Sequence, residues 1–237
     1  MQASMQVVTQ RSASTMRPAF PSIVNRPAPR DPLDLLEQFG TTVKVQRERE
    51  IHDQGDIADS CYRVMSGCVR LVTLMEDGRR HVSAFLLPGD LFGFDALETH
   101  DFAAEAVSDV VLRRYPRRTV EALAEQQMPL ARRLRDLTAA NLRAAHGQLV
   151  LLGRKTASEK IGSFLIEMAQ RLRTPRGSML ELPMSRTDMA DHLGLTIETV
   201  CRILAHLRRD GTIAVVRGGV EIRDHVALQQ IASEPRH

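Results

Sequence analysis

The segment from residue 185 to residue 207 constrains the fold more than any other part of the chain. Ser185 precedes a helical run and Asp188 follows three residues later, which is the pattern of a capping box that opens a helix. Gly194 interrupts the run at a place where glycine tolerates positive φ, and Thr196 can cap a second helix. The apolar residues of that second helix share one face: Val200, Ile203, Leu204 and Leu207. Two short helices that meet at a glycine corner indicate a helix-turn-helix.

The outer face of the second helix carries the chemistry. In a helix-turn-helix this helix enters the major groove of double-stranded DNA, and residues near its start meet base edges. The predicted contact residues are Thr196, Ile197, Glu198, Cys201 and Arg202. Arg202 can donate two hydrogen bonds to guanine, and Glu198 can accept one from the amino group of cytosine. The alternative is an ordinary i,i+4 ion pair worth about 0.2–0.5 kcal/mol; at this position we expect base reading.

The first half of the chain is punctuated by glycines. Gly55, Gly67, Gly78 and Gly89 fall 12, 11 and 11 residues apart, with short β-prone runs between them at 62–65, 69–74 and 81–87. This spacing predicts hairpins stacked into a β jelly roll. The dipeptide Asp77-Gly78 predicts a tight turn in which both central residues have positive φ.

Between residues 117 and 152 the apolar period becomes helical. A seam with alternating spacings of four and three residues predicts one long helix: Leu130, Leu134, Leu137, Asn141, Ala144, Gln148 and Leu151. The seam can pair with its copy in a homodimer, or the helix can pack on its own β domain. Both interpretations stay open at this point.

The sequence therefore predicts an α+β protein in four parts. Residues 1–31 form a disordered arm, 32–127 a β-roll sensor-like domain, 128–153 the dimerisation helix, and 154–237 a winged helix-turn-helix domain whose wing is a hairpin around Gly218-Gly219. The arm is rich in Arg and Ser and poor in acids, so a mitochondrial transit peptide is the weaker alternative for it. Residues 33–153 hold 15 basic and 18 acidic side chains, whereas residues 154–237 hold 13 and 10, which permits a polyanionic partner at the C-terminal end.

Several functional classes are excluded. No apolar run approaches the roughly 20 residues that cross a bilayer, so a membrane protein is not expected. Three cysteines cannot build a disulfide framework and suit a reducing compartment such as the cytoplasm. The eight histidines are scattered, and there is no glycine-rich phosphate loop, nucleophile elbow or metal-spaced His pair. We expect no enzyme activity, no catalytic residue and no metal site.

Taken together, these features resemble the Crp/Fnr family of bacterial transcription regulators over nearly all of residues 33–232. The segments 88–97 (PGDLFGFDAL) and 195–202 (LTIETVCR) are similar to the FixK-like branch of that family. The resemblance implies a homodimer that contacts RNA polymerase. It also implies that Glu198 and Arg202 read the half-site TTGA in an inverted repeat of the type TTGA-N6-TCAA.

Departures from the family pattern bear on what the protein senses. Cyclic-nucleotide binders of the family hold the phosphate with an Arg-Ser pair, but residues 93–105 contain no arginine, and Glu105 would repel a phosphate. Iron–sulfur members use four cysteines, and this chain has three. We therefore expect no bound cofactor. The resemblance to the FixK-like branch leads us to expect an activator of oxygen-limited gene expression that takes part in nitrogen fixation. The alternative is control by an unrecognised small effector in the β-roll.

Cys201 stands where relatives of the Fnr type usually carry serine. A thiol can be oxidised to an acid, and negative charge here would oppose the phosphates of DNA. We expect Cys201 to act as a redox-sensitive residue, the alternative being a small neutral contact. Cys61 and Cys68 are expected to be buried hydrophobic residues.

Overall fold

The computed structural model describes residues 31–94 and 98–233. The described residues from Pro32 onward belong to one compact unit. The predicted disordered arm at 1–31 thus lies almost entirely outside the described residues. Among the described residues, no helix is both long enough and apolar enough to cross a membrane.

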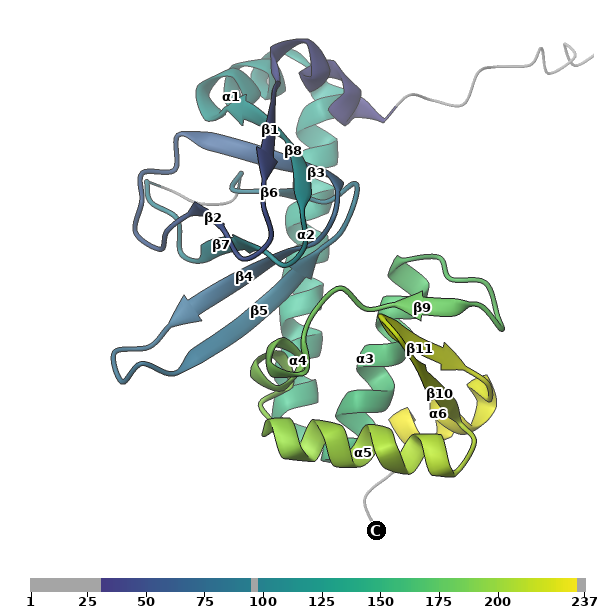
Figure 1. The fold of residues 1–237 in the computed structure, drawn as a ribbon. Coiled ribbons are helices and arrows are strands. Elements are labelled where there is room, and N and C mark those ends of the chain that lie inside the picture. The colour runs from purple at the N-terminus through teal and green to yellow at the C-terminus, as the bar shows by residue number, and fades with distance from the viewer. Residues whose placement is uncertain (1–30, 95–97, 234–237) are drawn as a thin grey trace, which may run out of the picture. The chain divides into compact units, whose positions relative to one another are not determined.

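The N-terminal half is a β-roll built from two four-stranded antiparallel sheets (Figure 1). A 3-10 helix η1 (Pro32–Phe39) precedes the strands. One sheet has the order β1-β8-β3-β6 and the other β2-β7-β4-β5. The strands are β1 (Thr41–Val45), β2 (Glu50–His52), β3 (Ser60–Ser66), β4 (Val69–Leu74), β5 (Arg80–Leu86), β6 (Leu91–Phe92), β7 (Ala103–Ala106) and β8 (Val110–Pro116). The predicted jelly roll is confirmed.

The turn between β4 and β5 differs from the prediction in its detail. Gly78 has φ +82°, but Asp77 is not among the residues with positive φ. The Gly78 backbone N–H donates to the Met75 carbonyl at 2.9 Å, and the Met75 N–H donates to the Arg79 carbonyl at 2.9 Å. The hairpin therefore closes through a wider turn over residues 75–78, in which only the glycine needs the left-handed conformation.

Two helices follow the roll: α1 (Arg117–Gln126) and the long α2 (Met128–Arg154). The predicted seam is wrong at Leu130, which is fully buried against the protein's own roll and not available to a second copy. Leu134 and Leu137 also pack against this roll cluster, and Leu151 packs against the core farther along the chain. The spacing of apolar residues predicts that α2 has an apolar stripe, but it does not predict whether the protein's own domains or a second copy cover that stripe.

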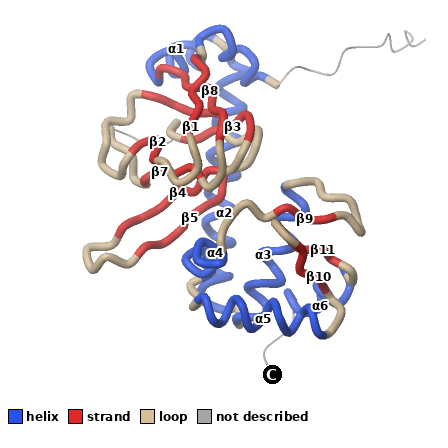
Figure 2. The backbone as a smooth tube through the Cα atoms, in the orientation of Figure 1, coloured by secondary structure: helices blue, strands red, loops and turns tan. Residues whose placement is uncertain are grey.

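The C-terminal half begins with α3 (Ala157–Arg171), whose N-terminus is closed by a capping box between Thr156 and Glu159. The strands β9 (Met179–Glu181), β10 (Ile213–Val216) and β11 (Gly219–Ile222) form a small antiparallel sheet in the order β10-β11-β9. The remaining helices are α4 (Arg186–Leu193), α5 (Ile197–Arg209) and α6 (His225–Ser233). The predicted wing is the β10–β11 hairpin, visible beside α5 in Figure 2.

One hydrophobic core continues from the β4–β5 side of the roll into the C-terminal half. Phe85 of β5 packs edge-on against Phe164 of α3, with ring centroids 6.1 Å apart, and His192 of α4 lies 5.2 Å from Phe85. All three side chains are buried. The helix-turn-helix is therefore packed against the roll through its first helix and not only joined to it by the chain.

Candidate nucleic-acid interface

The corner between α4 and α5 forms as the sequence predicts. The Ser185 hydroxyl accepts a hydrogen bond from the Asp188 N–H at 3.0 Å, and the Asp188 carboxylate accepts one from the Ser185 N–H at 2.9 Å. Gly194 closes α4 in the left-handed conformation with φ +59°, and the Leu195 N–H then donates to the Ala190 carbonyl at 3.0 Å. These bonds satisfy backbone groups that the helix ends would otherwise leave open, so the corner has a fixed geometry.

The second helix buries the face that its periodicity predicts. Val200, Ile203, Leu204 and Leu207 are at most 6% exposed, and they join the core that holds α3 and α4. Thr196 caps the helix, since its hydroxyl oxygen accepts from the Thr199 N–H at 3.2 Å. The opposite face of α5 is left free by this packing.

All five predicted contact residues lie on that free face or at its start. Thr196, Ile197, Glu198, Cys201 and Arg202 are each exposed, and Ile197 keeps 42% of its surface accessible. Glu198 and Arg202 are one helical turn apart, and they form no ion pair with each other or with any other described residue. The i,i+4 ion pair considered as an alternative is thus not formed. Thr196 has a capping role that the prediction did not separate from DNA contact.

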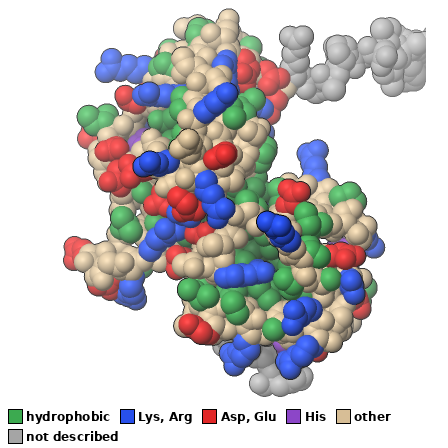
Figure 3. Space-filling model, viewed as in Figure 1, with side chains coloured by type: hydrophobic (Ala, Val, Ile, Leu, Met, Phe, Trp, Pro, Cys, Tyr) green, Lys and Arg blue, Asp and Glu red, His purple; other side chains and the backbone are tan. Residues whose placement is uncertain are grey.

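The surroundings of this face are basic. Arg208 and Arg209 end α5, and Arg217 lies at the tip of the β10–β11 hairpin; all three are exposed. Figure 3 shows Lys and Arg side chains gathered over the end of the molecule that carries α5 and the hairpin, with fewer acidic ones. Cations at such positions beside the second helix of a helix-turn-helix suit contacts with phosphates, which position a protein on the duplex.

Arg186, at the start of α4, is a neighbour of Cys201 that sequence reasoning missed. Burial lowers the pKa of Arg186, and its electrostatic interaction with Cys201 opposes this shift. The two residues are 15 positions apart, and only the corner between α4 and α5 brings them together. No spacing rule of a single helix could have found the pair.

The other two cysteines are interior residues, as predicted. Cys61 is fully buried and Cys68 is 1% exposed, and burial raises the pKa of the Cys68 thiol to about 12. Within the described part of the chain, no group of three or more His, Cys, Asp or Glu side chains could hold a metal ion.

A pocket of about 660 Å³ lies between the roll, α2 and α3. His52 and His100 line it with their rings stacked at a centroid distance of 3.6 Å, so the interpretation of the histidines as scattered is wrong for this pair. Burial and the neighbouring His100 lower the pKa of His52 to about 4, and its Nε2 atom has no hydrogen-bond partner among the residues that the structure describes. Glu105 does not line the pocket, contrary to expectation, and pairs with Arg70 at 2.6 Å.

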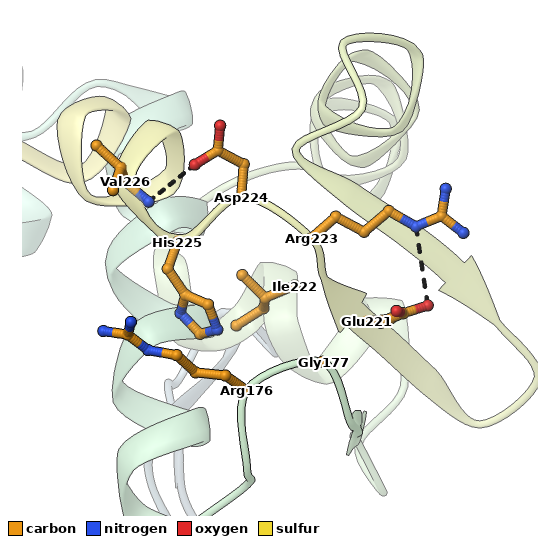
Figure 4. Close-up of a pocket in the computed structure, with 8 residues that line it drawn as sticks. All are labelled: Arg176, Gly177, Glu221, Ile222, Arg223, Asp224, His225 and Val226. Carbon is orange, nitrogen blue, oxygen red and sulfur yellow. Dashed lines mark hydrogen bonds and ion pairs between the residues drawn. The ribbon is translucent and has the colours of Figure 1, made fainter.

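A shallower pocket of about 570 Å³ lies at the start of α6 (Figure 4). Three of its polar side chains, those of Asp224, Arg223 and Glu221, already have partners. Asp224 accepts from the Val226 N–H at 2.9 Å and so caps α6, and Arg223 lies 3.8 Å from Glu221. Arg176 and His225 complete the polar lining. This arrangement stabilises the domain and adds nothing to the exposed face of α5.

Comparison with known proteins matches the two halves to two family models. Residues 42–127 match the cyclic nucleotide-binding domain, and residues 159–231 match the Crp-like helix-turn-helix domain. The region between the two matches contains the whole of α2.

Whole-chain relatives agree with both matches. The nitrogen fixation regulation protein FixK of Azorhizobium caulinodans is 44% identical over 206 residues, covering 85% of this chain and 83% of the relative. The transcriptional activator protein FnrL of Cereibacter sphaeroides is 37% identical over 206 residues, covering 84% and 81%. The structure of FixK2 from Bradyrhizobium japonicum superposes with a TM-score of 0.78 at 37% identity, covering 83% of this chain and 99% of that one. The chain belongs to the Crp/Fnr family of DNA-binding transcription regulators.

Proposed function

We propose that the protein is a homodimeric activator of oxygen-limited gene expression that reads an inverted repeat of the type TTGA-N6-TCAA and needs no bound cofactor. The carrying observation is the pair Glu198 and Arg202, exposed one turn apart at the start of α5 with no ion pair among the described residues. The names of the relatives, a nitrogen fixation regulator and a transcriptional activator, support the physiological part. Since its partners are DNA and RNA polymerase, we place its action in the cytoplasm.

The proposed chemistry follows from the free hydrogen-bonding groups. The Arg202 guanidinium offers a planar fork of donors for guanine O6 and N7, and the Glu198 carboxylate offers an acceptor for the amino group of cytosine. A half-site TTGA paired with its complement contains one G·C pair, which presents the guanine acceptors and the cytosine amino group on the same base pair. Two copies related by a twofold axis would read two half-sites about one helical turn apart.

The affinity of the protein for labelled duplexes tests this proposal directly. Arg202→Ala should reduce the preference for TTGAT-N4-ATCAA over a scrambled duplex by about 5- to 150-fold, which corresponds to about 1–3 kcal/mol for a bidentate contact. Arg209→Ala, a matched change at the far end of α5, should weaken binding to both duplexes alike. A variant at Arg202 that keeps the full preference would show that another residue reads the bases. Salt must be held fixed because phosphate contacts depend on it strongly.

Dimerisation is proposed through the middle of α2. Every residue from Asn141 to Gly147 is exposed, and Leu142 and Leu149 keep 57% and 68% of their surfaces accessible. These two leucines are seven residues apart and so share a face. Of the predicted seam, Asn141 and Ala144 are exposed beside them, while Leu130 belongs to the roll. A second copy that packs its own α2 on this face would cover these apolar side chains.

Sedimentation tests the dimer without DNA. Leu142→Asp together with Leu149→Asp should convert the dimer to a monomer, because two buried charges per copy would face each other across the interface. Leu74→Asp, at an equally exposed leucine of the roll, should leave the dimer intact. A dimer that survives the double change must use another surface.

We further propose that oxidation of Cys201 weakens DNA binding. Cys201 is exposed among the base-reading residues, and oxidation by peroxide to a sulfinate would place a negative charge at the duplex. Arg186, whose charge already interacts with Cys201, would be the counter-ion of the sulfinate. Peroxide should lower the affinity of the native protein, and Cys201→Ser should resist the treatment. Equal losses in both proteins would remove Cys201 from the mechanism.

A second candidate is control by a small effector in the roll. The pocket of about 660 Å³ favours it, as does the Nε2 atom of the buried His52, which has no hydrogen-bond partner within the described ranges 31–94 and 98–233. Purified protein that binds the inverted repeat fully without any addition supports the cofactor-free proposal. A requirement for a small-molecule fraction of the cell supports the effector, and cyclic AMP is the probe that tests the nucleotide class.

A further inference from the structure

A buried ion-pair network joins the roll to the first helix of the helix-turn-helix. Arg70 of β4 is 4% exposed and Asp188 of α4 is 3% exposed, and the Arg70 guanidinium donates to the Asp188 carboxylate at 3.0 Å. Arg70 also donates to Glu105 and to Glu48 at 2.7 Å each. Burial by itself lowers the pKa of Arg70, but the bonds to Glu48 and Glu105 and the charge of Asp188 raise it overall.

Arg80 of β5 binds the same carboxylate from a second strand. Its guanidinium donates to Asp188 at 2.8 Å and lies 3.4 Å from Asp191, one turn farther along α4. Two cations of the roll thus hold two anions on one face of α4. Removing one partner of such a buried network is costly because it leaves an uncompensated charge.

Three hydrogen bonds to backbone carbonyls fix the same helix. His81 of β5 lies 2.9 Å from the Asp191 carbonyl, and His192 of α4 lies 2.8 Å from the Val82 carbonyl. Gln148 of α2 donates to the His192 carbonyl at 2.7 Å. The helix α4 is therefore bound at once to the roll and to the proposed dimerisation helix.

We propose that Arg70 and Arg80 are positioning residues for DNA binding: by clamping α4 through Asp188, they set the angle at which α5 is presented and so the half-site spacing that the dimer accepts. The inference rests on the proposed function, because spacing has meaning only for a twofold pair of recognition helices. Neither arginine contacts DNA in this account. Each acts through α4, whose corner with α5 is fixed by Gly194 and the Ser185–Asp188 capping box.

The physical reason is geometric. Apart from the clamp, the orientation of the helix-turn-helix depends on the junction between α2 and α3 at Lys155, on the three hydrogen bonds to α4 described above, and on apolar packing, which is not directional. Ion pairs with fixed donor and acceptor directions select one orientation among those that the apolar contact permits. Two half-sites one helical turn apart require that orientation on both copies simultaneously.

Neighbouring arginines in the β4–β5 hairpin provide a matched experiment. Arg80→Met removes one of the two arginines of the clamp and leaves Arg70 on Asp188. Arg79→Met removes a guanidinium that is 75% exposed and that, among the described residues, pairs only with Asp77 of the same turn, at 2.7 Å. Affinity is measured for duplexes with half-sites separated by five, six and seven base pairs, over a range of salt concentrations. Sedimentation and circular dichroism check that each variant is a folded dimer.

We expect Arg80→Met to lose about 5-fold or more in affinity for the six-base spacing, in the range typical of coupling between sites. The preference for six over five and seven base pairs should fall as well, with an unchanged salt dependence, and Arg79→Met should match the native protein. Unchanged affinity, an equal loss at all three spacings, or a smaller salt slope would overturn the proposal; the last would make Arg80 a phosphate contact. If Arg80→Met does not fold, Arg80→Lys keeps the charge and should show the same loss of spacing preference. Native protein that does not prefer the inverted repeat would contradict the proposed function instead.

Discussion

Acidification should destabilise the junction between the roll and the helix-turn-helix through His192. This imidazole is 7% exposed, and its Nδ1–H donates to the Val82 carbonyl, which can only accept. It is surrounded by Phe85 and Phe164. Burial lowers the pKa of His192 from 6.5 to about 4, so the folded protein keeps the side chain neutral where the unfolded chain would take up a proton.

The sign and size of the effect follow from the two pKa values. Above the unfolded value both states are neutral and stability is complete; as pH falls from 6.5 toward 4 the unfolded chain binds the proton first, and stability declines. At about 1.4 kcal/mol per pH unit the full loss is about 3 kcal/mol, and about 2 kcal/mol of it should be present near pH 5. Below the folded value the loss levels off.

Urea unfolding at about pH 7.5 and about pH 5 measures the loss. His192→Gln should reduce the pH dependence by about 2 kcal/mol relative to the native protein, because the amide does not titrate in this range. The residual dependence in the His192 variant belongs to other groups, chiefly His52, whose pKa burial also lowers to about 4. If the His192 variant and the native protein lose stability in parallel, the buried neutral imidazole is not the cause.

Three further substitutions test the packing. Phe85→Ala, at a fully enclosed ring between the two halves, should cost about 3–5 kcal/mol in unfolding free energy; a loss under 1 kcal/mol would mean that the two halves are not packed together. Gly194→Ala should cost about 1 kcal/mol because φ is +59°, and a neutral result would place the corner in another conformation. Thr156→Ala should cost about 1 kcal/mol by removing the cap of α3, measured against Thr138→Ala on the exposed middle of α2.

Local signals account for what could be predicted from the sequence. The capping box at Ser185, the corner at Gly194 and the buried face of α5 involve residues within about one or two helical turns of each other, so their spacing determines their geometry. The β-roll follows in outline from glycine spacing for the same reason. The exposed position of Glu198 and Arg202 was predictable because the opposite face of their helix is apolar.

Contacts between distant segments could not be predicted in this way. Arg70 and Asp188 are 118 positions apart, and the capping box already accounts for an acidic residue at position 188, so the sequence gives no sign that Asp188 also pairs with Arg70. His52 and His100 come from separate strands and loops. The apolar stripe of α2 was visible in the sequence. Which of its residues pack on the roll, which pack on the C-terminal core and which stay exposed depends on the path of the whole chain.

The continuity of α2 also limits how this protein can change in length. The helix is anchored to the roll at Leu130 and to the C-terminal core at Leu151, and its exposed middle has no break between those anchors. Inserting one residue there would rotate one anchor by about 100° around the axis and shift it by about 1.5 Å relative to the other. Seven inserted residues would nearly restore the rotation while lengthening the helix by about 10 Å. The middle of α2 should therefore accept many amino-acid exchanges but almost no insertions or deletions.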